Sequence, residues 1–138
     1  MFAKEFDYIK VNSVSEAIQL LGNNEGAKLI AGGHSLLPMM KLRLAQPDML
    51  VDIAGIEELR GVSVENGTLR IGALTTHAEI AESHIVKDNA GILWEAAYGI
   101  GDPQVRNRGT IGGNVSHADP ASDLPTVLTV MDAKFTIQ

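Results

Sequence analysis

Two glycine-containing stretches hold the residue types best suited to binding an anionic ligand. They are Ala31-Gly32-Gly33-His34-Ser35, which follows a short apolar run, and Thr110-Ile111-Gly112-Gly113-Asn114. Glycine lets the backbone turn sharply and lets a ligand approach its N–H group without a Cβ in the way. Each stretch also carries a Ser, Thr or Asn that can hydrogen-bond an anionic oxygen. One Gly-Gly pair is usually only a structural turn, but a pair in each half fits two adjacent phosphates. The pattern therefore predicts a dinucleotide or diphosphate cofactor.

Neither stretch follows the common nucleotide-binding motifs. The first lacks the G-x-G-x-x-G spacing of a Rossmann fingerprint, and no G-x-x-x-x-G-K-[ST] loop occurs in the chain. Ordinary NAD-binding and P-loop functions are therefore disfavoured. Because His34 lies inside the first turn, we expect its backbone amide, rather than its ring, to contribute to binding.

The histidines do not form a metal-binding pattern. None stands in an H-x-x-x-H or H-E-x-x-H arrangement, and we expect them to be surface or locally hydrogen-bonded residues: His34, His77, His84 and His117. We predict no metal site, and no Ser–His–Asp arrangement or carboxylate pair indicates a hydrolase.

Asp123, Arg106 and Arg108 each have a structural and a functional interpretation. Asp123 follows Ser122, the expected N-cap, so it either stabilises a helix dipole or binds a ribose or ribityl hydroxyl. Arg106 and Arg108 either offset a diphosphate charge or face solvent. Asp102 and Asp119 each precede a proline, which is typical of turns.

Composition excludes several functional classes. The chain has 138 residues, a formal net charge of −6 and no cysteine. This acidic balance argues against a nucleic-acid surface, which is normally basic. Without cysteine the chain itself ligates no iron–sulfur cluster and forms no disulfide. We see no secretory signal and no apolar run long enough to span a membrane, so we predict a cytoplasmic protein.

The elements that position the first glycine stretch alternate between strand and helix. We expect strands over 8–11, 29–31 and 49–53, and helices that Ser13 and Ser35 open. Gly22 is expected to stop the first helix, and the second, carrying Lys41 and Arg43 late in its length, is expected to end at Pro47. This order predicts a small parallel sheet covered by helices.

The second half has a different pattern. Asn66-Gly67 predicts a type I′ hairpin turn between strands over 61–65 and 68–72. Helices are expected over 76–82, 92–100 and 122–131, with a long loop over 101–122 and a strand over 133–137. Because the chain stops inside that strand, we expect it to be the front part of a longer protein.

The predicted fold class is therefore α+β, with two lobes. The first lobe, 1–55, is a small parallel βαβαβ unit, and the second, 56–138, is an incomplete mixed or antiparallel sheet with helices.

Four motifs together resemble the FAD-binding medium subunit of molybdenum hydroxylases. The motifs are Ala31–Leu44, Asp102–Arg106, Gly109–Asn114 and Ser122–Pro125. The resemblance runs in order from about Phe6 to the end of the sequence, without an obvious gap. The chain is most similar to the carbon monoxide dehydrogenase type and more distantly to the flavin domain of xanthine dehydrogenase. The two glycine motifs are specific only as a pair.

The resemblance implies a site and a set of partners. FAD would lie between two α/β lobes. Its diphosphate would be bound, largely through backbone amides, by Ala31, Gly32, Gly33, His34, Ser35, Thr110, Ile111, Gly112, Gly113 and Asn114, and Leu36 and Asp123 match further contact positions of the family. Electrons would leave a substrate at a molybdopterin large subunit and cross two [2Fe–2S] clusters of an iron–sulfur small subunit. They would reach FAD here and pass to NAD, a quinone or oxygen.

That function makes the chain an oxidoreductase subunit with no catalytic acid–base residue of its own. Two alternatives stay open. One is a non-catalytic flavin-domain module for docking or assembly, and the other is a flavin oxidase of the vanillyl-alcohol oxidase type.

Overall fold

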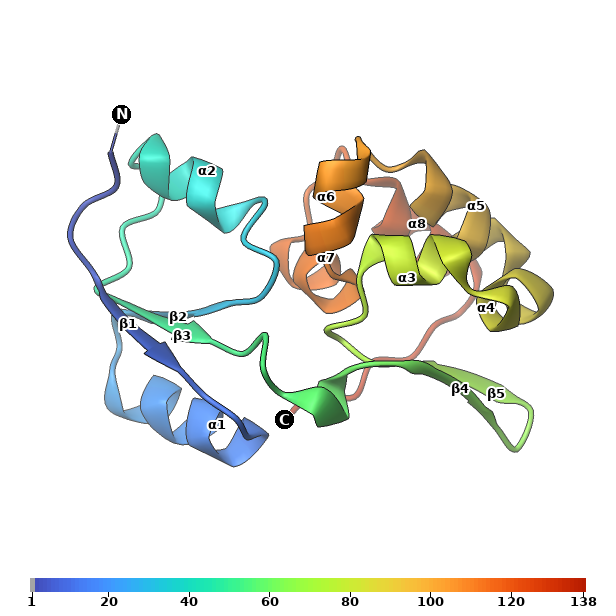
Figure 1. Ribbon diagram of the computed structural model, residues 1–138, viewed down its shortest axis with the longest axis horizontal. Helices are drawn as coiled ribbons and strands as arrows, with labels where there is room; N and C mark the ends of the chain where they lie inside the picture. The colour runs from blue at the N-terminus through green and yellow to red at the C-terminus, as the bar shows by residue number, and fades with distance from the viewer. Residues whose placement is uncertain (1) are drawn as a thin grey trace. The chain divides into compact units, whose positions relative to one another are not determined.

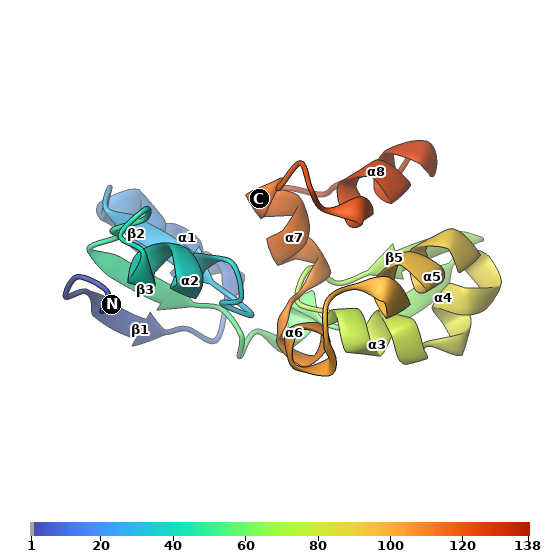
Figure 2. The same ribbon diagram turned by 90° about the horizontal axis from the view of Figure 1, so that it is seen from above.

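The structure is a computed structural model that describes residues 2–138, and it divides into two compact units. Within the described residues, unit 1 extends to Arg60 and unit 2 is Gly61–Gln138. Figures 1 and 2 show the elements of each unit in two perpendicular views. The boundary between FAD-binding lobes at residue 55 stays a prediction.

Unit 1 is built on a three-stranded parallel sheet with strand order β1-β3-β2. The strands are β1 (Asp7–Lys10), β2 (Ala27–Ile30) and β3 (Met49–Asp52). Leu50 and Val51 of the central strand are almost fully buried, as expected for a strand covered on both faces. Helices α1 (Val14–Asn23) and α2 (Leu36–Lys41) lie on opposite sides of this sheet (Figure 1). The predicted βαβαβ unit is confirmed.

Both helices of unit 1 differ from their predicted ends. The Ser13 side chain caps α1 as expected, but the helix passes through Gly22 and ends at Asn23, where Asn24 is the C-cap. Helix α2 ends at Lys41, well before Pro47, because Arg43 adopts a left-handed conformation with φ 60°. Arg43 therefore lies outside the helix rather than in its last turn. A short 3-10 helix, η1 (Glu57–Leu59), precedes the end of the unit.

Unit 2 combines one hairpin with six short helices. The hairpin pairs β4 (Val62–Glu65) with β5 (Thr68–Ile71), and its turn has φ 51° at Asn66 and 76° at Gly67, as the type I′ turn predicts. The helices are α3 (His77–Glu82), α4 (His84–Asn89), α5 (Gly91–Gly99), α6 (Pro103–Arg108), α7 (Ile111–His117) and α8 (Asp123–Val130). This mixture of antiparallel strands and helices confirms the predicted α+β class.

Two predictions about unit 2 are wrong, and one helix is not predicted. The stretch over 101–122 is not a long loop, because Asp102 caps α6 and Thr110 caps α7 with their side chains. Helix α4 was not expected, although Ser83 caps it in the same way. Residues 133–137 form no strand, since no segment of the described structure pairs with them.

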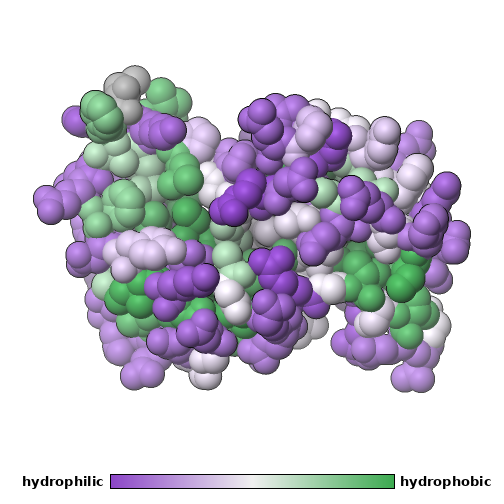
Figure 3. Space-filling model, viewed as in Figure 1, coloured by the Kyte–Doolittle hydropathy of each residue, from purple (hydrophilic) through white to green (hydrophobic). Residues whose placement is uncertain are grey.

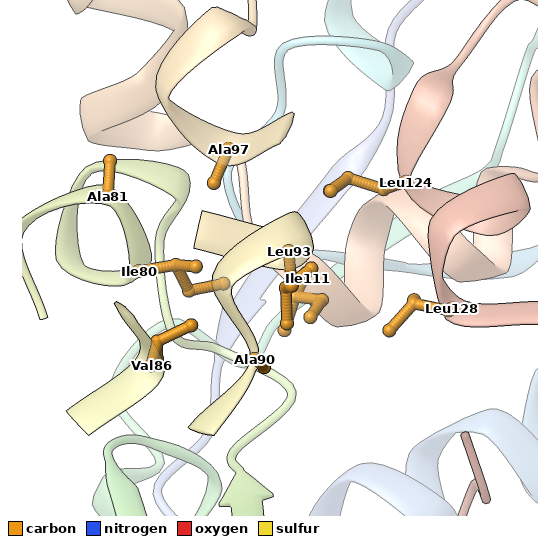
Figure 4. Packing of buried hydrophobic residues seen from close by; sticks show 9 residues of the cluster. All are labelled: Ile80, Ala81, Val86, Ala90, Leu93, Ala97, Ile111, Leu124 and Leu128. Carbon is orange, nitrogen blue, oxygen red and sulfur yellow. The ribbon is translucent and has the colours of Figure 1, made fainter. Parts of the chain in front are cut away.

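The core of unit 2 lies between its helices (Figure 4). It is made of nine buried hydrophobic residues: Ile80, Ala81, Val86, Ala90, Leu93, Ala97, Ile111, Leu124 and Leu128. Ile111 belongs to this cluster, so the first residue of α7 is anchored in the core. Packing of Ile111 in the core therefore fixes the position of the second glycine stretch within unit 2.

Hydrophobic surface is also present, as Figure 3 shows for one face in green among purple hydrophilic residues. Within unit 1, Leu42 and Leu44 are 54% and 72% exposed, and within unit 2, Tyr98 and Val130 are 64% and 72% exposed. Scattered exposed apolar residues are normal on a protein surface. Among residues 2–138, no helix has the length and apolar character that a membrane crossing needs. The cytoplasmic location stays a prediction.

Candidate functional site

The first glycine stretch is the strand-to-helix turn between β2 and α2. It leaves the carboxyl end of a parallel strand, which is where open α/β sheets bind their ligands. Gly33 has φ 76°, a conformation that L side chains rarely adopt, so this position requires glycine. A Cβ there would also lie 3.0 Å from the Leu37 Cδ1 atom.

The backbone N–H groups of this turn are unpaired within the described structure. None of the six N–H groups of residues 31–36 donates a hydrogen bond to another protein atom. Their carbonyl groups are used, since Gly33 and Ser35 accept from Leu37 and Met39 at 2.9 and 3.2 Å. A run of unpaired N–H groups at a glycine turn is a backbone arrangement that binds anions. The turn is therefore open to a ligand on its donor side.

The side chains of the turn contribute less. His34 is exposed, and its Nδ1 lies 3.1 Å from the Gly32 carbonyl oxygen. Ser35 precedes α2 but makes no capping hydrogen bond with its side chain, contrary to the sequence expectation. Its hydroxyl is therefore free of the helix backbone.

The second glycine stretch is not a loop but the first turn of α7. The N–H groups of Ile111 to Asn114 are paired within the chain, whereas that of Thr110 donates to no atom of the described residues. Ile111 donates to the Thr75 carbonyl at 3.0 Å, and Gly112 donates to the Ala73 carbonyl at 2.9 Å. Gly113 donates to the Thr110 hydroxyl at 3.2 Å. Asn114 donates to the Thr110 carbonyl at 3.0 Å. The two stretches, alike in sequence, thus differ in how many donors they leave for a ligand.

Close packing inside unit 2 explains one glycine of the second stretch. A Cβ at Gly112 would lie 2.7 Å from the Ala73 carbonyl oxygen. A Cβ at Gly113 would lie 2.9 Å from the Thr110 hydroxyl oxygen and near no other atom of the described residues. Gly113 is exposed, so its open side is available to a ligand.

Side chains rather than amides are the free polar groups of the second stretch. The Asn114 side-chain oxygen accepts a hydrogen bond from the Ser122 hydroxyl at 2.9 Å. This contact leaves the Asn114 NH₂ group without a protein partner among the described residues. Ser122 was expected only as an N-cap, yet it makes no capping bond. No sequence pattern predicts this side-chain pairing.

Asp123 lies beside a groove of about 430 Å³ between α5 and α8. The groove is lined by Ile92, Glu95, Ala96, Gly99, Asp123, Thr126 and Val127. Asp123 is the first residue of α8 and is exposed, which is where a carboxylate favours the helix dipole. Both readings of Asp123, dipole partner and ligand contact, are compatible with this position.

The role of Arg106 toward a diphosphate stays a prediction, and the expectation for one histidine is wrong. Arg106 is half-buried, and its guanidinium donates through Nη1 to the Ile100 carbonyl at 3.0 Å. It also lies over the Tyr98 ring at 5.9 Å. His77 is neither a surface nor a hydrogen-bonded histidine: it is 3% exposed and its Nδ1 has no partner in the described structure. Burial lowers the pKa of His77 to about 4.

The remaining charged residues agree with their expected positions. Arg108, His84 and His117 are exposed. Asp102 caps α6, and the Asp119 carboxylate accepts from the Ala121 N–H at 2.9 Å, a local turn contact. Among residues 2–138 no three His, Asp or Glu side chains lie together as a metal site would require. The prediction of no metal remains a prediction.

The chain is similar to known proteins over almost its whole length. Residues 4–138 match the family model described as the FAD binding domain in molybdopterin dehydrogenase. The chain is 50% identical to the carbon monoxide dehydrogenase medium chain of Hydrogenophaga pseudoflava, covering 100% of this chain and 48% of that protein. It is 37% identical to the xanthine dehydrogenase FAD-binding subunit of Escherichia coli O157:H7, covering 94% of this chain and 45% of that protein.

A solved structure shows the same fold. A chain of carbon monoxide dehydrogenase from Hydrogenophaga pseudoflava, in a form lacking the Mo-pyranopterin moiety of its molybdenum cofactor, aligns with TM-score 0.89 and 54% identity. The alignment covers 91% of this chain and 44% of that chain. The chain thus spans about half the length of the relatives it matches.

Proposed function

Because the chain belongs to the family of FAD-binding domains of molybdopterin dehydrogenases, we propose that it is the FAD-binding electron-transfer subunit of a molybdenum hydroxylase complex. The family's cofactor is FAD, and its members are subunits of dehydrogenases. FAD, when bound, supplies the redox chemistry of its ring system, while the protein binds, orients and shields it.

The observation that carries this proposal is the donor-rich turn at residues 31–36. Its unpaired N–H groups and the left-handed Gly33 fit a diphosphate, which needs donors and close approach of the backbone. We propose that Ala31 to Leu36 bind the diphosphate through these N–H groups.

Unit 2 contributes differently in this proposal. Because the N–H groups of Ile111, Gly112 and Gly113 have internal partners, the segment Thr110–Asn114 offers the open side of Gly113 and the Asn114 NH₂ group. Asp123 offers a carboxylate that can accept a hydrogen bond from a hydroxyl of the cofactor. The chemistry at this segment is therefore positioning rather than amide-based anion binding.

Partners are also part of the proposal. The chain has no cysteine, so it supplies no thiolate ligand for an iron–sulfur cluster. We propose that a partner small subunit holds the iron–sulfur clusters and that a large subunit holds the molybdopterin cofactor. NAD, a quinone and oxygen remain candidate electron acceptors.

A docking module is the second candidate, and one observation favours it. The N–H groups of Ile111 to Asn114 are used within the chain, which leaves fewer donors there for a flavin diphosphate. A module of this kind would assemble with the same partners but bind no flavin. The matched relatives are molybdenum dehydrogenase subunits, which supports this family of functions over a flavin oxidase.

Elemental and cofactor analysis of the native complex distinguishes these functions. The protein is purified with a tag from cells that make it naturally, and FAD, iron and molybdenum are measured per chain. The proposal predicts all three in fixed ratio. Iron and molybdenum without FAD would identify the docking module. FAD without either metal would contradict the proposal and favour the oxidase.

A further inference from the structure

The buried His77 side chain is a polar group whose position the FAD site so far leaves unexplained. His77 is the first residue of α3, and its Nδ1 atom is the buried side-chain polar atom that lacks a partner among the described residues. Leaving a buried polar atom unpaired costs stability. The fold carries this cost, which indicates that the ring contributes something else at this place.

The imidazole fills the space beside Gly109. A Cβ at Gly109 would lie 2.8 Å from the His77 Cδ2 atom, 2.9 Å from its Nε2 atom and 3.2 Å from the Val105 carbonyl oxygen. Gly109 has φ −62°, a conformation open to every residue type. The neighbouring ring, and not the backbone conformation, is therefore the main reason for a glycine here.

The same residues align two backbone segments. The His77 N–H donates to the Gly109 carbonyl at 3.0 Å, and the Ile111 N–H donates to the Thr75 carbonyl at 3.0 Å. These two bonds form an isolated antiparallel bridge between Thr76 and Thr110. Because Thr110 is the N-cap of α7, the bridge determines where α7 begins.

Thr76 is also fixed by hydrogen bonds to Glu79. Its N–H and hydroxyl donate to the Glu79 carboxylate at 2.6 and 2.8 Å, within the capping box of α3. The bridge thus connects the N-cap of α3, Thr76, with the N-cap of α7, Thr110. His77 is the side chain that packs across it.

We propose that His77 is a positioning residue for FAD binding: its ring, packed against Gly109, sets the placement of the Thr110–Asn114 segment. The ring acts through Gly109 and need not touch the cofactor. This inference rests on the proposed function, because it assumes that Thr110–Asn114 contributes to the FAD site.

Two substitutions separate the volume of the ring from its nitrogen atoms. His77→Ala empties the space beside Gly109, and His77→Leu refills most of it with an apolar side chain. FAD is titrated into the purified full-length protein, and the dissociation constant and the visible circular dichroism of the bound flavin are measured. His77→Ala should raise the dissociation constant on the order of tenfold and change the flavin dichroism. His77→Leu should keep both close to wild type.

A volume exchange provides the matched control. Gly109→Ala alone should weaken FAD binding because its methyl group meets the imidazole. In the double variant His77→Ala/Gly109→Ala the contacts with the ring are gone and only the 3.2 Å approach to the Val105 carbonyl oxygen remains, so FAD should bind more tightly than to Gly109→Ala alone. Such non-additivity is the signature of direct contact between the two sites.

Three results would overturn the inference. One is wild-type affinity and flavin dichroism in His77→Ala, including the case in which only its thermal stability falls. Another is a folded His77→Leu variant that binds FAD as poorly as His77→Ala. The third is strict additivity in the double variant. These results would leave the proposed function standing, whereas failure of the wild-type protein to bind FAD would reject both.

Discussion

The Gly112 N–H donates to the Ala73 carbonyl oxygen at 2.9 Å, and a Cβ on Gly112 would lie 2.7 Å from that same oxygen. This glycine is therefore required by contact within unit 2. Gly33, in the corresponding motif of unit 1, has φ 76° and an N–H without a partner among the described residues. Two motifs with similar sequences thus have different structural reasons for their glycines. The anion-binding donors are concentrated in the first.

We predict that Gly33→Ala weakens FAD binding by at least about tenfold, because the added methyl group disturbs a turn that presents N–H donors. Gly67→Ala is the matched control, since Gly67 also has φ 76° but nothing lies within 4 Å of its Cβ position. Both variants should lose about 1–2 kcal/mol of stability from backbone strain. Isothermal titration with FAD should then separate them, and equal affinities would count against the turn as the diphosphate site.

Gly112→Ala should destabilise unit 2 by about 1–3 kcal/mol, because its methyl group meets the Ala73 backbone. Gly91→Ala in α5, also in unit 2, is the control: nothing lies within 4 Å of that Cβ position, so it should be neutral or stabilising by up to about 1 kcal/mol. Urea unfolding without FAD measures both. Trp94, the only tryptophan of the chain, reports on unit 2 by its fluorescence. Wild-type stability of Gly112→Ala would contradict this, because it would show that the Ala73 backbone can move to make room for the methyl group.

Asn114→Asp should weaken FAD binding by roughly tenfold while folding normally, since it replaces a donor NH₂ group by an anionic oxygen near a proposed anionic cofactor. The Ser122 hydroxyl can still donate to the new carboxylate, so the local pairing survives. Asn89→Asp in α4 adds the same charge on an exposed residue outside the proposed site. Fluorescence titration with FAD compares the two, and an unaffected Asn114→Asp variant would remove Asn114 from the site.

Unit 2 should lose stability in mild acid because of His77. Its pKa is about 4 in the folded protein and 6.5 without burial, so between these values the unfolded chain binds more protons. The free energy of unfolding therefore falls as the pH drops through this window, by about 3 kcal/mol in total. Stability at higher pH is unaffected.

Trp94 fluorescence in urea at several pH values between about 4 and 7 tests this. His77→Leu should flatten the dependence, and His84→Leu, which changes an exposed histidine, should leave it as in wild type. A His77→Leu protein with the wild-type slope would assign the acid sensitivity to other groups.

The sequence predicts the elements whose signals are local. Nearby residues predict the Asn66-Gly67 turn, the helix over 76–82 and the three parallel strands, and the structure confirms them. Each depends on a capping side chain, a turn dipeptide or a short apolar run. Such signals need no knowledge of distant contacts.

The features that the sequence does not predict depend on contacts between distant residues, or lie in stretches rich in residues that usually break helices. Helices α6 and α7 lie in a stretch rich in Gly, Asp and Pro, which favours loops by composition. Their Asp102 and Thr110 caps, together with the burial of Ile111, stabilise them anyway. The partners of Gly112 and His77 lie more than thirty residues away along the chain. No local pattern in the sequence indicates that the second glycine stretch uses its own amides.

Titration of the purified protein with FAD, followed by thermal unfolding, tests the central claim most directly. A ligand that binds only the folded state raises its stability, by about 2.7 kcal/mol at a hundredfold excess over the dissociation constant. The account predicts saturable binding of one FAD per chain, a higher unfolding temperature, and a clear loss of both in Gly33→Ala but not in Gly67→Ala. A folded wild-type protein whose unfolding temperature does not change at saturating FAD would contradict it.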